Sequence, residues 1–232
     1  MKTTRNEKIF RILWYAAAIS LTIYYGVNPF LAGETTWYNM LIFMGTALLG
    51  YFCVSTLVER SPVLGNVSGM SANVGEMYTQ FYFGNIGMVF SALYYFITHL
   101  IGLNIWTKKE NQDSEGKIKI ANTNRNALIL TVLFCLAGIA VMCFWGHKII
   151  KEDNQFLFVL NVIAFVIGIS AQFVMIMRQP FSWILWSICN VVWLVLNLIS
   201  NNYIFAVQSV LYEINAVIGI YKWYKYKEIL KP

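Results

Sequence analysis

The sequence carries very little charge. Only 12% of its 232 residues are Asp, Glu, Lys or Arg, whereas 58% are hydrophobic, and its mean hydropathy is +0.58. An average soluble domain has about 25% charged residues. A soluble chain of this length could not bury so much apolar surface. The composition therefore excludes an ordinary soluble domain and indicates a protein that lies in a lipid bilayer.

Residues that usually build chemical sites are also scarce, with 4 cysteines and 2 histidines. The cysteines lie inside apolar runs and form no CxxC pair, so we expect free thiols and neither a disulfide nor a metal site. The sequence contains no P-loop, no HExxH and no nucleophile elbow. We therefore expect no catalytic residue and no cofactor, and we predict that the protein is not an enzyme.

Eight segments are candidates for membrane-spanning helices, each of which needs about 20 largely apolar residues. They are residues 9–30, 37–58, 62–82, 83–106, 127–146, 155–177, 180–201 and 203–225. The third is the weakest, because it is rich in glycine and serine and carries Glu76. The first follows a basic segment and could be a span, an in-plane helix or a signal peptide. It has no clean small-x-small cleavage site, so we expect an uncleaved spanning helix.

Basic residues cluster in alternate connections between these segments. They collect at the N-terminus, at Arg60, in residues 107–126, at Arg178 and at the C-terminus, with Lys148 and Lys151 as exceptions. Eight spans place all these clusters on one side, so the positive-inside rule predicts that both termini are cytoplasmic. The net charge of +6 is thus explained by short segments flanking the membrane, and we expect no nucleic-acid partner.

The second half of the chain repeats features of the first half. Arg60-Ser61-Pro62 recurs 118 residues later as Arg178-Gln179-Pro180, and Gly50 recurs as Gly168. GLNIW at 102–106 recurs 117 residues later as GIYKW. At this second offset Asn73 matches Asn190, Gln80 matches Asn197, and Tyr95 matches Tyr212.

The repeat predicts an all-α membrane protein with a three-plus-one-plus-three plan. Two three-helix units, 37–106 and 155–225, are joined by a cytoplasmic loop at 107–126 and one linking helix at 127–146. A helix within 1–36 precedes them and a cytoplasmic tail, 226–232, follows. One linking helix leaves both units with the same topology, so we expect a parallel repeat like that of small sugar transporters, with a site between the units.

The seventh segment carries the densest group of candidate site residues. Trp183, Trp186, Asn190 and Asn197 fall on one narrow face of a helix. Membrane-buried amides usually face a bundle interior or a polar path. Indole rings beside an amide suit a flat aromatic ligand, because the rings stack and the amide reads a polar edge. The alternative is an interfacial tryptophan belt with amides that only pack helices.

Other polar stripes point to the same expected cavity. Gln208, Tyr212 and Asn215 share a face of the last segment, and Gln172 lies on a polar face of the sixth. From the first unit, Asn73 and Gln80 could complete the cavity. Amide hydrogen bonds between helices are the alternative explanation for each stripe. We expect the glycines of the third segment, Gly65, Gly69 and Gly75, to mark close helix contacts instead.

Acidic residues and histidine are almost absent from the spans, where only Glu76, His99 and Glu213 occur. No two of them occupy equivalent repeat positions, and Glu213 points away from the stripe of Gln208. A proton relay normally needs a chain of such groups. A lone glutamate that is neutral and hydrogen-bonded explains the pattern as well as a proton carrier does.

The pattern WxxWxxxN at Trp183, Trp186 and Asn190 resembles that of the PnuC vitamin transporters. The three-plus-one-plus-three plan and the terminal GIYKWYK agree with the resemblance, which covers about residues 37–225. It implies that the two indoles pack around the nicotinamide ring of nicotinamide riboside and that Asn190 hydrogen-bonds the substrate. The helix at 9–30 lies outside the pattern.

The same resemblance implies a bacterial inner-membrane carrier with a SWEET-like fold, working as a homotrimer. It implies uncoupled facilitated diffusion by alternating access, with the substrate trapped inside through phosphorylation by a cytoplasmic riboside kinase. Two other readings stay open. The ligand could be another flat vitamin or nucleoside such as thiamine, or the protein could be a receptor or scaffold that does not transport.

Overall fold

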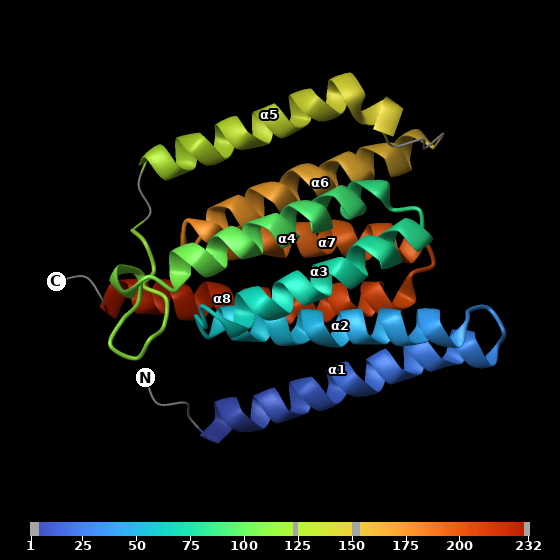
Figure 1. Cartoon of the computed structure of the whole chain (residues 1–232), viewed down its shortest axis with the longest axis horizontal. Coiled ribbons are helices and arrows are strands. Elements are labelled where there is room, and N and C mark those ends of the chain that lie inside the picture. Colours follow the sequence, from blue (N-terminus) through green and yellow to red (C-terminus); the bar gives the residue numbers. More distant parts are fainter. Residues whose placement is uncertain (1–4, 123–124, 150–153, 230–232) are drawn as a thin grey trace.

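The computed structural model describes residues 5–122, 125–149 and 154–229. Within these ranges the chain is helical, with eight α-helices and one short 3-10 turn, Lys109–Asn111. The helices are α1 Arg5–Leu31, α2 Trp37–Val58, α3 Leu64–Tyr82, α4 Ile86–Trp106, α5 Arg125–Ile149, α6 Gln155–Ile176, α7 Ser182–Ile199 and α8 Tyr203–Ile229 (Figure 1). Seven of these described helices are long and apolar enough to cross a membrane, and α3 is the exception. The third segment is therefore helical, although its hydropathy alone does not mark it as a span.

Local sequence signals set where the helices start and stop. The side chains of Thr36 and Asn154 accept backbone N–H groups at the starts of α2 and α6, as N-caps do. Both helices end in a left-handed residue, Arg60 with φ 62° and Arg178 with φ 59°. Such φ values are uncommon outside glycine. A proline follows each arginine by two residues and cannot continue the preceding helix.

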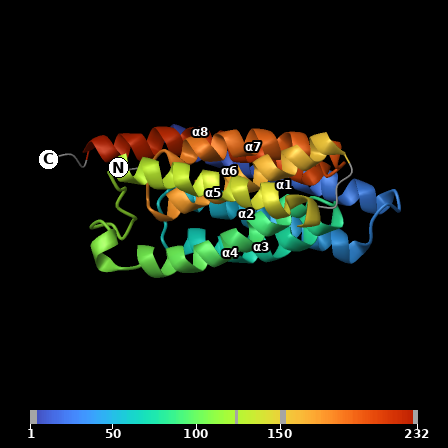
Figure 2. The same cartoon turned by 90° about the horizontal axis from the view of Figure 1, so that it is seen from above.

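The helices form two groups of three. α3 packs against α2 and α4, and α7 packs against α6 and α8. The groups meet along α4 with α6 and along α2 with α8. α1 lies against α2 and α8, and α5 lies against α6, so these two helices flank the bundle on opposite edges (Figure 1). Figure 2 shows the same elongated bundle from above.

The two contacts between the groups are built alike. Gly50 of α2 touches the hydroxyl of Tyr212 on α8, and Gly168 of α6 touches the hydroxyl of Tyr95 on α4. A Cβ atom at either glycine would collide with the facing hydroxyl. Because these glycines and tyrosines are the pairs that the sequence repeat matches, each group offers a glycine to the tyrosine of the other group.

A second matched pair of contacts lies at the turn between α3 and α4 and at the turn between α7 and α8. The amide of Asn85 donates to Gln80 Oε1 at 2.9 Å, and the amide of Asn202 donates to Asn197 Oδ1 at 3.0 Å. All four side chains are buried. The glycines of α3 also behave as expected, because Gly65 touches Leu57, Gly69 touches His99 and Gly75 touches Thr46.

The predicted basic clusters lie at one end of the bundle. The start of α1, the corners at Arg60 and Arg178, the segment 107–122 and the end of α8 all lie at the left in Figure 1. At this end Lys222 Nζ lies 2.7 Å from Glu59 and 3.2 Å from Glu7, and Arg11 also pairs with Glu59. This cluster ties α1 to α2 and α8. Burial disfavours the charged form of Glu59, but Lys222 and Arg11 hold its pKa below the ordinary value of 4.5.

Candidate functional site

A cavity of about 60 Å³ lies between the two helix groups. Its walls come from the six helices of the two groups, α2 to α4 and α6 to α8. The main polar and aromatic lining residues are Asn73, Glu76, Tyr95, His99, Gln172, Trp183, Trp186, Asn190, Trp193 and Tyr212.

One wall of the cavity is aromatic. The Trp186 ring meets Tyr95 edge-on at 5.4 Å between centroids and meets Trp193 at 5.8 Å. Trp183 meets Trp223 edge-on at 5.7 Å. Edge-to-face packing is a favoured geometry for aromatic pairs, so neighbouring rings hold both predicted indoles in place.

Asn190 lies beside this wall with its amide held in one orientation. Its Nδ2 donates to Glu213 Oε2 at 3.3 Å, and Ser187 donates to the other oxygen of Glu213 at 2.5 Å. The Oδ1 of Asn190 is buried and has no partner within the described residues. Glu213 thus holds the Nδ2 of Asn190, and the Oδ1 of Asn190 remains available to accept a hydrogen bond.

Three further buried polar atoms of the lining have no partner in the described part of the chain. They are the indole N–H groups of Trp183 and Trp193 and the hydroxyl of Tyr95. Buried polar groups in proteins are nearly always hydrogen-bonded, and exceptions call for an explanation. Three donors and one acceptor gathered at one cavity are what a small polar ligand with both kinds of group requires.

The opposite wall is the cavity face of α3. Gly69, Ala72, Asn73 and Glu76 line it at the spacing of one helix face. Asn73 donates to the carbonyl of Gly69 at 2.8 Å, whereas no hydrogen bond or ion pair joins Glu76 to any other described residue. The nearby His99 is engaged through its Nδ1 with Asn66 at 3.0 Å. No Lys or Arg occurs among the described lining residues.

The cavity brings together six of the ten residues that the sequence predicted for the site. These six are Asn73, Gln172, Trp183, Trp186, Asn190 and Tyr212. Asn73 is the counterpart of Asn190 in the sequence repeat, so each helix group contributes one of these two amides to the cavity.

The structure does not bring the other four predicted residues to the cavity. Gln80 and Asn197 hold the turns described above, and Gln208 donates to the carbonyl of Ala47 on α2 at 3.3 Å. Asn215 bonds within α8 and lines a separate groove beside α1. For Gln80, Asn197 and Gln208 the alternative of helix-packing amides describes what the structure shows, since an amide in a membrane bundle is satisfied equally well by a neighbouring backbone or side chain.

Sequence reasoning missed several lining residues. Trp193 lies seven residues after Trp186, Tyr95 is the repeat counterpart of Tyr212, and Glu76 lies three residues after Asn73. Each spacing is that of a shared helix face or of the repeat. Extending the predicted faces by one turn would have found Trp193 and Glu76.

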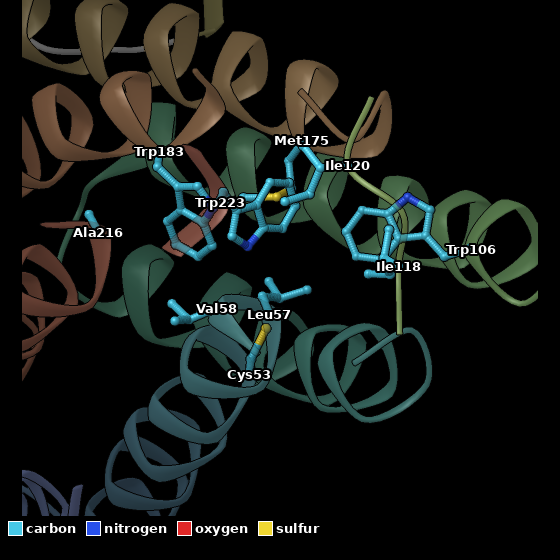
Figure 3. Close-up of a cluster of buried hydrophobic side chains, with 10 residues drawn as sticks. All are labelled: Cys53, Leu57, Val58, Trp106, Ile118, Ile120, Met175, Trp183, Ala216 and Trp223. Carbon is cyan, nitrogen blue, oxygen red and sulfur yellow. The ribbon is translucent and has the colours of Figure 1, made fainter. Parts of the chain in front are cut away.

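The segment 107–122 packs against Trp183 at the basic end of the bundle. The N–H of Ile118 donates to the carbonyl of Arg60, and the N–H of Ala121 donates to that of Arg178, both at 3.0 Å. The segment thus joins the equivalent corners of both helix groups. Ile118 is fully buried in a cluster that includes Trp106, Trp183 and Trp223 (Figure 3).

An ionic contact holds the same segment in place. The buried guanidinium of Arg60 donates to Asp113 Oδ2 at 3.0 Å and to the Ile118 carbonyl at 2.9 Å. Partial burial raises the pKa of Asp113, but the N–H of Lys117 and the charge of Arg60 outweigh it and leave the pKa below its usual range. The carboxylate is therefore ionised at neutral pH and holds the segment 107–122 to the corner at Arg60.

The fold is similar to a solved structure, the crystal structure of the vitamin B3 transporter PnuC. The TM-score is 0.72 with 19% sequence identity, and the match covers 93% of this chain and 92% of that chain. At this identity the likeness establishes the fold. No curated protein matches the chain.

The family model described as nicotinamide mononucleotide transporter matches residues 39–225. This range runs from the start of α2 almost to the end of α8 and contains the whole cavity, while α1 lies outside it. The chain therefore belongs to the nicotinamide mononucleotide transporter family, a family of membrane transporters and not of enzymes.

Proposed function

We propose that this protein carries nicotinamide riboside across a bacterial inner membrane. The observation that supports this most is the cavity itself, in which an aromatic wall meets a fixed amide with a free acceptor. Trp183 and Trp186 would pack around the nicotinamide ring. Asn190 Oδ1 would accept from the N–H₂ of the carboxamide, because Glu213 already engages Nδ2. The unpartnered indole and phenol donors match the oxygens of a ribose.

The riboside fits better than the mononucleotide. A phosphate group is usually held by Arg, Lys or a helix N-terminus. The described cavity residues include neither Lys nor Arg, and of the helix starts only that of α7, at Trp183, reaches the cavity. A dianionic phosphate in this lining would have no counter-charge and would face the carboxyl group of Glu76.

We further propose that the two helix groups are the halves of a SWEET-like parallel repeat and move against each other in alternating access. The matched contacts of Gly50 with Tyr212 and of Gly168 with Tyr95 support this, because equivalent helices form both contacts. Opening toward the basic end would require the segment 107–122 to leave the corners at Arg60 and Arg178.

The remaining features follow from the family resemblance. Transport is uncoupled facilitated diffusion, a cytoplasmic riboside kinase traps the substrate, and the protein is a homotrimer. The positive-inside rule separately supports cytoplasmic termini. The isolated positions of Glu76, His99 and Glu213 support an uncoupled mechanism, since a proton relay needs a connected chain of such groups.

Binding and uptake measured on the purified protein test the proposal. Calorimetry should show saturable binding of nicotinamide riboside and much weaker binding of nicotinamide mononucleotide, nicotinamide and thiamine. Proteoliposomes should equilibrate labelled riboside. Preferred binding of thiamine would assign the site to another vitamin, and binding without uptake would indicate a receptor.

A further inference from the structure

We propose that Glu76 is a specificity-determining residue, whose carboxylate supplies the counter-charge to a cationic aromatic ring. The site would then select a cationic ligand over a neutral ligand of the same shape. This inference rests on the proposed function, because nicotinamide riboside carries a permanent positive charge on its pyridinium nitrogen.

The position of Glu76 is the first support. It shares the cavity face of α3 with Asn73, about midway along the helix. The same cavity is lined by Tyr95 of α4, Asn190 of α7 and Tyr212 of α8, which belong to both helix groups. Glu76 thus faces the space between the two helix groups and not lipid.

The lack of a protein partner is the second support. Glu213 of α8 bonds Ser187 and Asn190, and His99 bonds Asn66. Glu76 makes no such bond to any residue that the structure describes. A charge away from water is costly unless it is paired, and ionisable residues in membrane helices usually mark functional sites. A cationic ligand would provide the missing partner.

The broken symmetry of the repeat is the third support. The register that matches Asn73 with Asn190 also matches Glu76 with Trp193, and all four residues line the cavity. One unit therefore contributes a carboxylate where the other contributes an indole. A flat cation between these walls is attracted by the indole faces and by the carboxylate. A neutral ring keeps only the stacking, and an anionic ring is repelled.

The test compares nicotinamide riboside with its reduced form, 1,4-dihydronicotinamide riboside. The two share ribose and carboxamide, but the reduced ring is uncharged. Calorimetry on the full-length protein in nanodiscs gives the ratio of the two affinities for the wild type, Glu76→Gln and Glu76→Asp. Glu34→Gln is the matched control, because it removes a carboxylate at an exposed position that does not line the cavity. Thermal melting verifies that each variant is folded.

The wild type should prefer the cationic form, and Glu76→Gln should reduce this preference by about thirtyfold or more, the lower end of the effect of removing one member of a buried charge pair. Glu76→Asp should keep most of the preference, and Glu34→Gln should leave it near the wild-type ratio. An unchanged ratio in a folded Glu76→Gln protein that still binds the riboside would overturn the inference and leave the proposed function intact. An equal loss in both Gln variants would also overturn it, since the field would then be diffuse. Failure of the wild type to bind the riboside would remove the proposed function and this inference together.

Discussion

Replacement of Trp186 by alanine is the most direct test of the aromatic wall. Trp186 is partly buried, lines the cavity, and meets Tyr95 and Trp193 edge-on. Stacking of a base on an aromatic side chain is worth about 1–3 kcal/mol by alanine substitution. Riboside affinity should therefore fall by roughly five- to two-hundredfold.

The same change also removes structural contacts. Each aromatic pair contributes about 0.5–1.5 kcal/mol beyond its buried area, so the loss of two pairs should destabilise the fold by roughly 1–3 kcal/mol. This loss of stability is measurable but leaves the protein folded at the temperature of the assay. Trp186→Phe keeps a ring at the same position and should recover part of the affinity.

Calorimetry beside a melting curve separates the two effects. Trp145→Ala serves as the matched control, because this tryptophan lies on α5, is 54% exposed and does not line the cavity. It should leave affinity unchanged. Wild-type affinity in a folded Trp186→Ala protein would refute the assignment of the aromatic wall to the ligand.

Four further outcomes follow from the structure. Asn190→Leu should weaken riboside binding and also lower the melting temperature modestly, because it removes the free acceptor Oδ1 together with the hydrogen bond from Nδ2 to Glu213; a fall in stability with unchanged binding would make it a packing residue. Gly168→Ala should destabilise the bundle by roughly 1–3 kcal/mol through collision with the Tyr95 hydroxyl, and the added change Tyr95→Phe should recover part of the loss in a melting assay. Vesicles with clamped voltage should equilibrate the riboside at the same rate with or without proton and sodium gradients; accumulation driven by either gradient would contradict uncoupled transport. The contribution of Glu59 to stability should be complete above its ordinary pKa of 4.5 and be lost as the pH falls through its lower folded pKa, so Glu59→Gln should flatten the acid side of the melting profile.

The fold could be predicted largely from the sequence. Hydropathy locates the long apolar helices because the bilayer fixes their length, and seven of the eight predicted segments correspond to described helices that meet this criterion. α3 could be recognised only through the repeat, because its small and polar residues suit close helix contact and not lipid. The alternation of basic segments predicted their common end, since this pattern depends on loop charge alone.

The residues of the site could be predicted less completely than the fold. Helical spacing placed Trp183, Trp186 and Asn190 on one face, and the cavity contains all three. The same spacing could not distinguish them from Gln208 and Asn197, because a polar stripe looks alike whether its partner is a ligand, a backbone carbonyl or another amide.

The sequence alone determined the class of protein, its apolar helices and the helix face shared by Trp183, Trp186 and Asn190, because each depends on composition or on periodicity along the chain. Only the tertiary structure decided which polar groups are left without a protein partner. Glu213 engages one side of the Asn190 amide, whereas Glu76 lines the cavity without a hydrogen bond or ion pair to any described residue. Pairing between buried groups is a property of helices brought together in space, and two glutamates of one sequence acquire different roles through the neighbours that packing gives them.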